Sequence, residues 1–207
     1  APKGILYLLH GGGGGGLDWM RNTAIERYAQ PYDLVVIMPE VDGSCFYADM
    51  KHGYPYFQYL TEEVPAAMEG MLPLLQGVEK RYVAGLSMGG YGALKIALKN
   101  CDKFCAGAGI SSVADIVGRA KSFSSPLNSV FGDELEIPND EDLFYLAEKQ
   151  NDNPLKPRIY MGVGTEDFLY DSNCKLRDKF NALNYDFTYR ESQGTHSWEF
   201  WDEYIQY

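Results

Sequence analysis

The chain has little of what most metal-binding or disulfide-bonded proteins use. It contains three histidines and four cysteines among 207 residues. No two cysteines form a CxxC pair, and no histidines have a ligand-like spacing, so a structural metal site is not expected. We expect free, partly buried thiols, with a disulfide as the alternative. The four cysteines are Cys45, Cys101, Cys105 and Cys174.

Long apolar runs are also absent. No apolar stretch reaches the ~20 residues that a membrane-spanning helix needs, so no membrane span is predicted. The first residue is Ala1 rather than Met, and a strand-like run begins by Gly4, while the chain stops within a helix-like segment. We therefore expect residues to be missing at both ends. The predicted location is cytoplasmic, with secretion as the alternative if a signal peptide has been removed.

Basic residues are outnumbered by acidic ones. Lys and Arg total 18 against 29 Asp and Glu, which gives a net charge of −11. Such a surface repels phosphates, so neither nucleic acid nor an anionic membrane is an expected partner. The hydrophobic fraction of 45% is ordinary for a globular protein. The length predicts one domain over residues 1–207.

Apolar runs alternate with helical patterns along the whole chain. This alternation predicts an α/β fold, a mostly parallel sheet with helices on both faces. Residues 111–140 have no clear period and are expected to form a lid or insertion. We predict strands at Gly4–Leu9, Leu34–Met38, Arg81–Ala84, Phe104–Ile110, Arg158–Val163 and Asp186–Glu191. We predict helices at Asp18–Gln30, Phe57–Gln76 with an irregularity at Pro65, Gly89–Leu98, Glu141–Gln150, Asp171–Leu183 and Ser197–Tyr207.

One pentapeptide points to chemistry. Gly-Leu-Ser-Met-Gly, from Gly85 to Gly89, matches G-x-S-x-G between a predicted strand and a predicted helix. In that context the serine lies on a tight turn, and flanking glycines leave room for neighbouring backbone. The hydroxyl is then exposed at the positive end of the helix. Ser87 is therefore the predicted nucleophile. The alternative is a small-residue turn that only packs helix on sheet.

A serine hydroxyl needs a base, and histidine is the usual one near neutral pH. The three histidines are His10, His52 and His196. After a serine turn of this kind, the acid and then the histidine follow in chain order. Only His196 lies after Ser87, which selects it as the predicted base.

The acid must then lie between Ser87 and His196, preferably just after a strand. Asp167 meets both conditions, because it follows the strand ending at Val163 within Gly-Thr-Glu-Asp. Its expected task is to hold one tautomer of the histidine and to stabilise the imidazolium. Glu166 and Asp171 are the rival acids, and a plain turn-capping role for Asp167 is the alternative.

The first strand ends in His10 followed by six glycines. A loop of this type donates a main-chain N–H to the oxyanion, together with the residue after the nucleophile. The predicted donors are Gly12 and Met88, and His10 is expected to support the loop. A phosphate-binding loop is disfavoured, since no G-x-x-x-x-G-K-[ST] pattern is present. A plain flexible turn remains the alternative.

These motifs carry a family resemblance. The run Leu8 to Gly11, the elbow Ala84 to Ala93, the turn Gly164 to Tyr170 and the ending Gly194 to Trp201 resemble the esterase D-type family of α/β-hydrolases. Within that family the chain is most similar to bacterial tributyrin esterases. The resemblance implies the α/β-hydrolase fold, cleavage of short-chain acyl esters and no cofactor. It also implies a triad of Ser87, Asp167 and His196 with oxyanion donors Gly12 and Met88.

The expected substrate is a small-molecule or carbohydrate ester, including acetyl or feruloyl esters. An aromatic-rich loop at residues 42–59 is a candidate pocket wall, with ordinary packing as the alternative. Three other functions remain open. They are an S-formylglutathione hydrolase-like thioesterase, an acyltransferase with the same triad and a non-catalytic binding protein on a hydrolase scaffold. The first is disfavoured, because a Thr-Cys pair typical of such hydrolases is replaced here by glycine.

Overall fold

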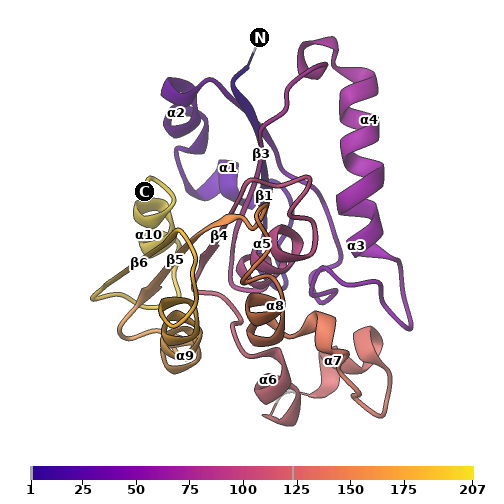
Figure 1. The fold of residues 1–207 in the computed structure, drawn as a ribbon, viewed down its shortest axis with the longest axis vertical. Helices are drawn as coiled ribbons and strands as arrows, with labels where there is room; N and C mark the ends of the chain where they lie inside the picture. The colour runs from indigo at the N-terminus through magenta and orange to yellow at the C-terminus, as the bar shows by residue number, and fades with distance from the viewer. Residues whose placement is uncertain (1, 123) are drawn as a thin grey trace.

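A computed structural model describes residues 2–122 and 124–207. Its centre is a six-stranded sheet in the order β2-β1-β3-β4-β5-β6, with every neighbouring pair parallel (Figure 1). The predicted α/β architecture is therefore confirmed. The strands are β1 (Gly4–Leu9), β2 (Leu34–Ile37), β3 (Arg81–Leu86), β4 (Ala106–Ile110), β5 (Arg158–Gly164) and β6 (Phe187–Ser192).

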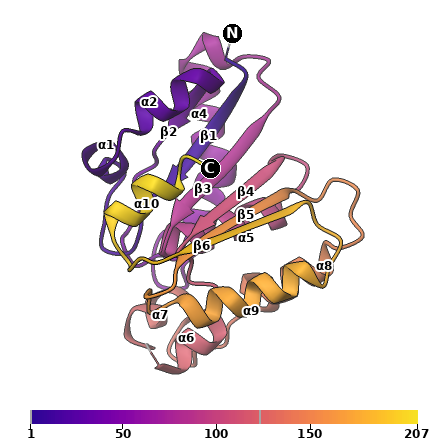
Figure 2. The ribbon, with the colours of Figure 1, turned by 90° about the vertical axis from the view of Figure 1, so that its left-hand side faces the viewer.

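Helices cover both faces of the sheet, as Figure 2 shows. On one face, α1, α2 and α10 enclose an apolar cluster that includes Trp19, Ile25 and Phe200. A larger cluster on the other face joins the sheet to the remaining helices. The α-helices are α1 (Asp18–Asn22), α2 (Ile25–Ala29), α3 (Tyr56–Gln58), α4 (Val64–Met71), α5 (Met88–Lys99), α6 (Ile116–Ser122), α7 (Ser124–Phe131), α8 (Leu143–Lys149), α9 (Tyr170–Asn181) and α10 (Trp198–Tyr204). None of the helices in the described part of the chain is both long and apolar enough to cross a membrane.

The predicted single helix at Asp18–Gln30 is wrong, because the chain forms two short helices there. Thr23 adopts an extended conformation at the end of α1. Its hydroxyl donates a hydrogen bond to the carbonyl oxygen of Trp19 and accepts one from the N–H of Ile25. A threonine side chain that bonds main chain in this way competes with continued helix. A 3₁₀ turn, Gln30–Tyr32, then leads into β2.

The helix predicted at Phe57–Gln76 is interrupted near Pro65, as expected. A π-helical turn, Tyr59–Glu63, joins α3 to α4, and a 3₁₀ turn, Pro73–Leu75, follows. Proline has no N–H to donate to the residue four positions earlier, which is Thr61. The carbonyl oxygen of Thr61 instead accepts a hydrogen bond from Lys103 Nζ at 3.4 Å.

Residues 111–140, which have no clear period, form α6 and α7 in the described part, and residue 123 lies outside it. Two main-chain hydrogen bonds join the end of α7 to the aromatic-rich loop. Lys51 N–H donates to Val130 O at 2.8 Å, and His52 N–H donates to Ser129 O at 2.9 Å. The segment therefore packs against the loop after β2. A 3₁₀ turn, Asn139–Glu141, leads from it to α8.

Candidate active site

The sequence-predicted residues lie at one edge of the sheet. Ser87 directly follows β3, Asp167 follows β5 and His196 follows β6. Because all strands are parallel, their carboxyl ends meet at the same edge, where sites collect in folds of this kind. The fold thereby brings together Ser87 and Asp167, which are 80 positions apart along the chain, and Asp167 and His196, which are 29 positions apart.

The turn at Ser87 is a strained strand-to-helix elbow. Ser87 has φ 54° and ψ −117°, a conformation that L-residues rarely adopt. Its N–H donates to Ile110 O at 2.9 Å, and its carbonyl oxygen accepts from Val113 N–H at 3.1 Å. A Cβ at Gly89 would overlap the carbonyl oxygens of Leu9 and His10. The surrounding backbone therefore holds the serine in place, which is how such strain persists.

The three predicted side chains form one hydrogen-bonded line. His196 Nε2 lies 3.0 Å from Ser87 Oγ, and His196 Nδ1 lies 2.8 Å from Asp167 Oδ2. With an ionised Asp167, the imidazole proton resides on Nδ1, and Nε2 is left to accept the serine proton. The side chain of Asp167 is buried, whereas that of His196 is 19% exposed. The arrangement can pass a proton from the hydroxyl to the imidazole.

Asp167 is stabilised in its charged form despite its burial. Desolvation would raise the pKa of Asp167, but hydrogen bonds from His196, the Leu169 N–H and Ser111 outweigh it and hold the pKa below the ordinary value. Ser111, fully buried with φ 46°, accepts a hydrogen bond from Trp201 Nε1 at 3.1 Å. The acid therefore remains a carboxylate near neutral pH.

Sequence reasoning missed three residues around this line. Ser111 and Trp201 support Asp167, and the Trp201 ring also meets the His196 ring edge-on at 4.9 Å. Phe168, two-thirds exposed, packs its ring 4.6 Å from that of His196 on a tilt of 51°. Ser111 carried one usable signal, since it is the first residue after β4 at the same strand edge.

Two loops carry the acid and the base side by side. A Cβ at Gly164 would overlap the backbone of Gly194, so only glycine allows this approach. Thr165 N–H donates to Ser192 O at 2.9 Å, and Glu166 N–H donates to Gly194 O at 2.9 Å. These bonds align the turn after β5 with the turn after β6.

The rival acids lie elsewhere. The Glu166 side chain is exposed and accepts a hydrogen bond from Gln193 Nε2 at 3.1 Å. Asp171 is exposed in the first turn of α9. The structure therefore brings Asp167, rather than either neighbour, to His196.

The predicted oxyanion donors, Gly12 and Met88, lie next to each other. A Cβ at Gly12 would be 4.0 Å from Met88 Cβ. Met88 is the first residue of α5, where main-chain N–H groups have no partner within the helix. In the described part of the chain, neither N–H donates to another protein atom. Both are therefore free to donate to a substrate.

The histidine before the glycine run supports this loop. The His10 side chain is fully buried, and its Nδ1 donates to Gly11 O at 2.9 Å. Its Nε2 accepts from Val41 N–H at 3.4 Å. Gly13, at φ 70°, donates its N–H to Gly43 O at 2.8 Å. His52, by contrast, is an exposed surface residue.

The aromatic-rich loop divides into two parts. Phe46 and Tyr47 are buried in the core. Tyr54, Tyr56 and Tyr59 pack edge-to-face on one another, with ring centroids 5.4 to 6.3 Å apart. Much of the loop therefore packs internally, which was the alternative to a pocket wall.

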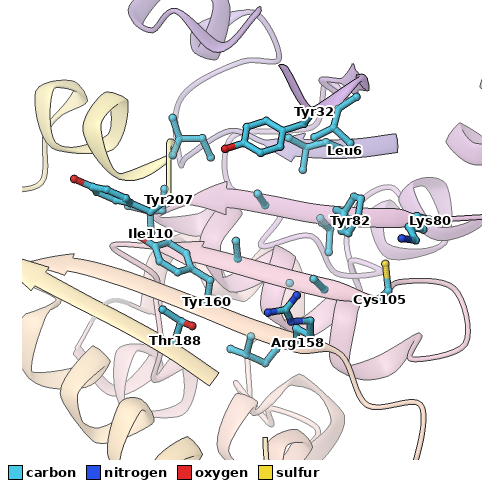
Figure 3. Close-up of a pocket in the computed structure, with 18 of the residues that line it drawn as sticks. Leu6, Tyr32, Lys80, Tyr82, Cys105, Ile110, Arg158, Tyr160, Thr188 and Tyr207 are labelled. Atoms are coloured by element: carbon cyan, nitrogen blue, oxygen red, sulfur yellow. The ribbon is translucent and has the colours of Figure 1, made fainter. Parts of the chain in front are cut away.

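A cavity of about 710 Å³ opens elsewhere, on the sheet face beside α10. Figure 3 shows Tyr82, Arg158 and Tyr160 projecting from the strands that form its floor. Its lining among the described residues includes no member of the line formed by Ser87, His196 and Asp167. Size alone therefore does not mark the reacting centre here.

The four cysteines are free thiols; Cys45 is buried, Cys101 and Cys174 are half-buried and Cys105 is exposed. Across residues 2–122 and 124–207, no group of three or more His, Cys, Asp or Glu side chains is placed to hold a metal ion.

The fold and the hydrogen-bonded serine, histidine and aspartate define a serine hydrolase of the α/β-hydrolase class. The model of the family described as Putative esterase matches residues 2–206. An acetyl esterase of Caldicellulosiruptor saccharolyticus is 35% identical over 97% of this chain and 79% of its own length. A diacylglycerol acyltransferase/mycolyltransferase of Mycobacterium intracellulare is 30% identical over 88% of this chain and 66% of its own.

Solved structures of similar fold also support the assignment to the serine hydrolases. A fluorophosphonate-binding serine hydrolase of Staphylococcus aureus, with substrate bound, has a TM-score of 0.87 at 31% identity and covers 99% of this chain and 81% of that one. An S-formylglutathione hydrolase of the same organism has a TM-score of 0.84 at 31% identity, with 99% and 82% covered. The chain therefore belongs to the Putative esterase family. It is a serine esterase, and the expected family resemblance is confirmed.

Proposed function

We propose that Ser87 is the nucleophile of this esterase, His196 its base and Asp167 the acid that orients the base. Ser87 Oγ attacks the ester carbonyl carbon while its proton passes to His196 Nε2. The main-chain N–H groups of Gly12 and Met88 hold the negative oxygen of the tetrahedral intermediate. As the carbon–oxygen bond breaks, His196 returns the proton to the leaving alcohol. An acyl-enzyme on Ser87 remains.

Water then completes the cycle. His196 Nε2 takes a proton from the water as its oxygen attacks the acyl carbon, and the same main-chain donors hold the second oxyanion. Collapse of this intermediate returns the proton to Ser87 Oγ and releases the carboxylic acid. Asp167 keeps its charge throughout and stabilises the imidazolium that forms twice in each turnover.

One observation carries the proposal. Ser87, His196 and Asp167 form a continuous line at 3.0 and 2.8 Å, and the Ser87 backbone is strained so that the hydroxyl meets the imidazole. Packing of a small-residue turn, the alternative for this motif, needs neither the strained conformation nor the aligned partners.

The proposed substrates are short-chain acyl esters, including acetyl or feruloyl esters of carbohydrates. The acetyl esterase among the relatives supports a short acyl group. The net charge of −11 supports a neutral substrate over a phosphorylated or polyanionic one.

Turnover of 4-nitrophenyl acetate tests this function. Wild type should hydrolyse it, and Ser87→Ala should lower kcat by a factor on the order of 10⁵ to 10⁶, because the triad acts as a unit. Ser129→Ala, which changes an exposed serine on α7, is the matched control and should retain wild-type turnover. Equal turnover by wild type and Ser87→Ala would exclude Ser87 as nucleophile. No turnover of any ester by wild type would favour a non-catalytic binding scaffold.

Two other acyl-transfer functions use the same residues. The relatedness to a mycolyltransferase supports transfer of the acyl group to an alcohol instead of water. The likeness to an S-formylglutathione hydrolase supports a thioester as substrate. Product analysis with sugar or alkyl alcohol acceptors distinguishes transfer from hydrolysis, and the ratio of kcat/KM for matched thioester and oxygen ester distinguishes the substrates.

A further inference from the structure

The oxyanion loop depends on contacts from another part of the chain. Glycine-rich backbone has more conformational freedom than any other, so a run of six glycines does not hold two donors in register by itself. The segment after β2 makes several hydrogen bonds with this loop, and two of them lie on either side of Gly12. Gly43 O accepts the N–H of Gly13, and the Tyr47 hydroxyl donates to His10 O at 2.8 Å.

Tyr47 also contacts the helix that carries the other donor. The side chain is fully buried, and a Cβ at Gly92 on α5 would lie 2.6 Å from the Cγ atom of the Tyr47 ring. The carbonyl oxygen that receives its hydroxyl lies against the same helix, since a Cβ at Gly89 would be 2.5 Å from His10 O. The ring therefore rests on α5 while its hydroxyl holds the end of β1.

The backbone at Tyr47 is strained, and a buried charged side chain helps to hold it. Phe46 and Tyr47 have φ values of 47° and 52°, which two consecutive aromatic residues rarely adopt. Lys95 Nζ, fully buried on α5, donates to Phe46 O at 3.1 Å and pairs with Glu141 at 2.6 Å. Such strain persists only where the surrounding contacts over-determine it. Nothing in the chemistry of the triad requires this arrangement.

The hydroxyl is a permanent donor. Burial raises the pKa of Tyr47 well above its ordinary value, so the phenol keeps its proton at any working pH. Among the described residues, the acceptor of this hydroxyl is His10 O, the carbonyl just before the Gly11–Gly12 peptide.

We propose that Tyr47 is a positioning residue of the oxyanion hole, whose hydroxyl sets the spacing between the Gly12 and Met88 N–H groups. The inference rests on the proposed function and goes beyond it by adding a residue that never touches substrate. Loss of the hydroxyl releases the His10 carbonyl from α5 and lets the glycine loop drift. The triad itself is left intact.

Tyr47→Phe tests this inference. The variant should lower kcat roughly 10- to 100-fold, less than or equal to the loss of one oxyanion donor, while KM changes by no more than about two-fold. The affinity of phenylboronic acid, which forms a tetrahedral adduct with the serine, should fall by a factor similar to that for kcat. A role in folding alone would lower the amount of active enzyme without changing that affinity.

Tyr185→Phe is the matched control. Its hydroxyl also donates to a main-chain carbonyl, Ala147 O, at 2.8 Å, but between α8 and the segment after α9. This variant should retain wild-type kcat and boronic acid affinity. 4-Aminophenylalanine at position 47 keeps a donor on the same ring and should restore most of the lost kcat. If Tyr47→Phe does not fold, 4-fluorophenylalanine fills the volume of the hydroxyl without a donor and serves the same comparison.

The outcomes separate the two proposals. Absence of ester turnover by wild type overturns the proposed function and this inference with it. An active wild type with equal kcat and equal boronic acid affinity in Tyr47→Phe overturns the inference alone. A loss of kcat that the amino analogue fails to relieve also overturns it, because the donor would then not be the cause.

Discussion

Asp167 has different partners for its two carboxylate oxygens. Oδ2 faces His196 Nδ1, and Oδ1 accepts the N–H of Leu169 at 2.8 Å. Ser111 adds a further hydrogen bond, and Trp201 orients Ser111. An amide in this position would have to present an N–H to one of these donors. The carboxylate is therefore specified by its surroundings as well as by its chemistry.

Asp167→Asn should lower kcat by about 10³ to 10⁴, because the amide favours the wrong imidazole tautomer while leaving the fold largely intact. Glu166→Gln is the matched control, one residue earlier, on an exposed acid that bonds Gln193. It should keep wild-type kcat. Steady-state turnover of 4-nitrophenyl acetate measures both, and a loss of similar size in the two variants would contradict the assignment of Asp167.

The lowered pKa of Asp167 also predicts a pH dependence of stability. Between the folded-state pKa and the ordinary value of 3.8, the unfolded chain binds more protons than the folded one. The stabilisation is thus fully present above that ordinary value and is lost as pH falls through the folded-state pKa. Urea unfolding at several pH values should show that the difference in free energy of unfolding between wild type and Asp167→Asn becomes smaller as the pH falls. A difference independent of pH would contradict this prediction.

At the scale of single residues, the sequence predicted the site residues that lie in a recognisable motif or that were the only candidates of their type. Ser87 lies in a recognisable pentapeptide, and His196 is the only histidine after it. Ser111, Trp201 and Tyr47 were not predicted. Each acts through a hydrogen bond to a residue far along the chain, and no local pattern specifies such a pairing.

Among the elements, the turn from β3 to α5 carries a strict steric requirement. The carbonyl oxygens of Leu9 and His10 lie directly against Gly89, so no Cβ fits between the helix and the start of the oxyanion loop. This contact places Met88 N–H beside Gly12. The close packing of α5 on the end of β1 therefore also sets the relative position of the two oxyanion donors.

Gly89→Ala should destabilise the fold by about 2–4 kcal/mol and remove most activity, because the added Cβ has no space among main-chain atoms. Gly70→Ala is the matched control on α4, where a Cβ meets no atom within 4 Å. That change should be neutral or stabilise the protein by up to about 1 kcal/mol. Thermal unfolding and ester turnover measure both variants, and a Gly89→Ala enzyme of normal stability and activity would refute the steric argument.

The strands and most helices were predictable from their apolar patterns. The failures came where a single side chain changes the backbone path. Thr23 ends α1 through its own hydroxyl, which hydrophobic periodicity does not report. The helices within residues 111–140 were missed, because α7 contains Pro126 and both helices are short. The role of that segment as a lid stays a prediction.

At the scale of the whole molecule, six segments distant in sequence meet at one edge of the sheet. They are the glycine loop after β1, the segment after β2, the elbow after β3, the residues after β4, and the turns after β5 and β6. Figures 1 and 2 show these segments gathered beyond the same ends of the strands. The large cavity on the sheet face takes no part in this convergence. The parallel topology, rather than any single motif, therefore assembles the site.

Covalent labelling of Ser87 tests the central claim most directly. A fluorophosphonate should modify wild type once, and peptide mass analysis should place the adduct on Ser87. His196→Ala should slow the labelling by several orders of magnitude, because the hydroxyl is then a weak nucleophile. Ser87→Ala should remain unlabelled. An adduct on a different residue, or labelling of Ser87 at the same rate without His196, would contradict the account.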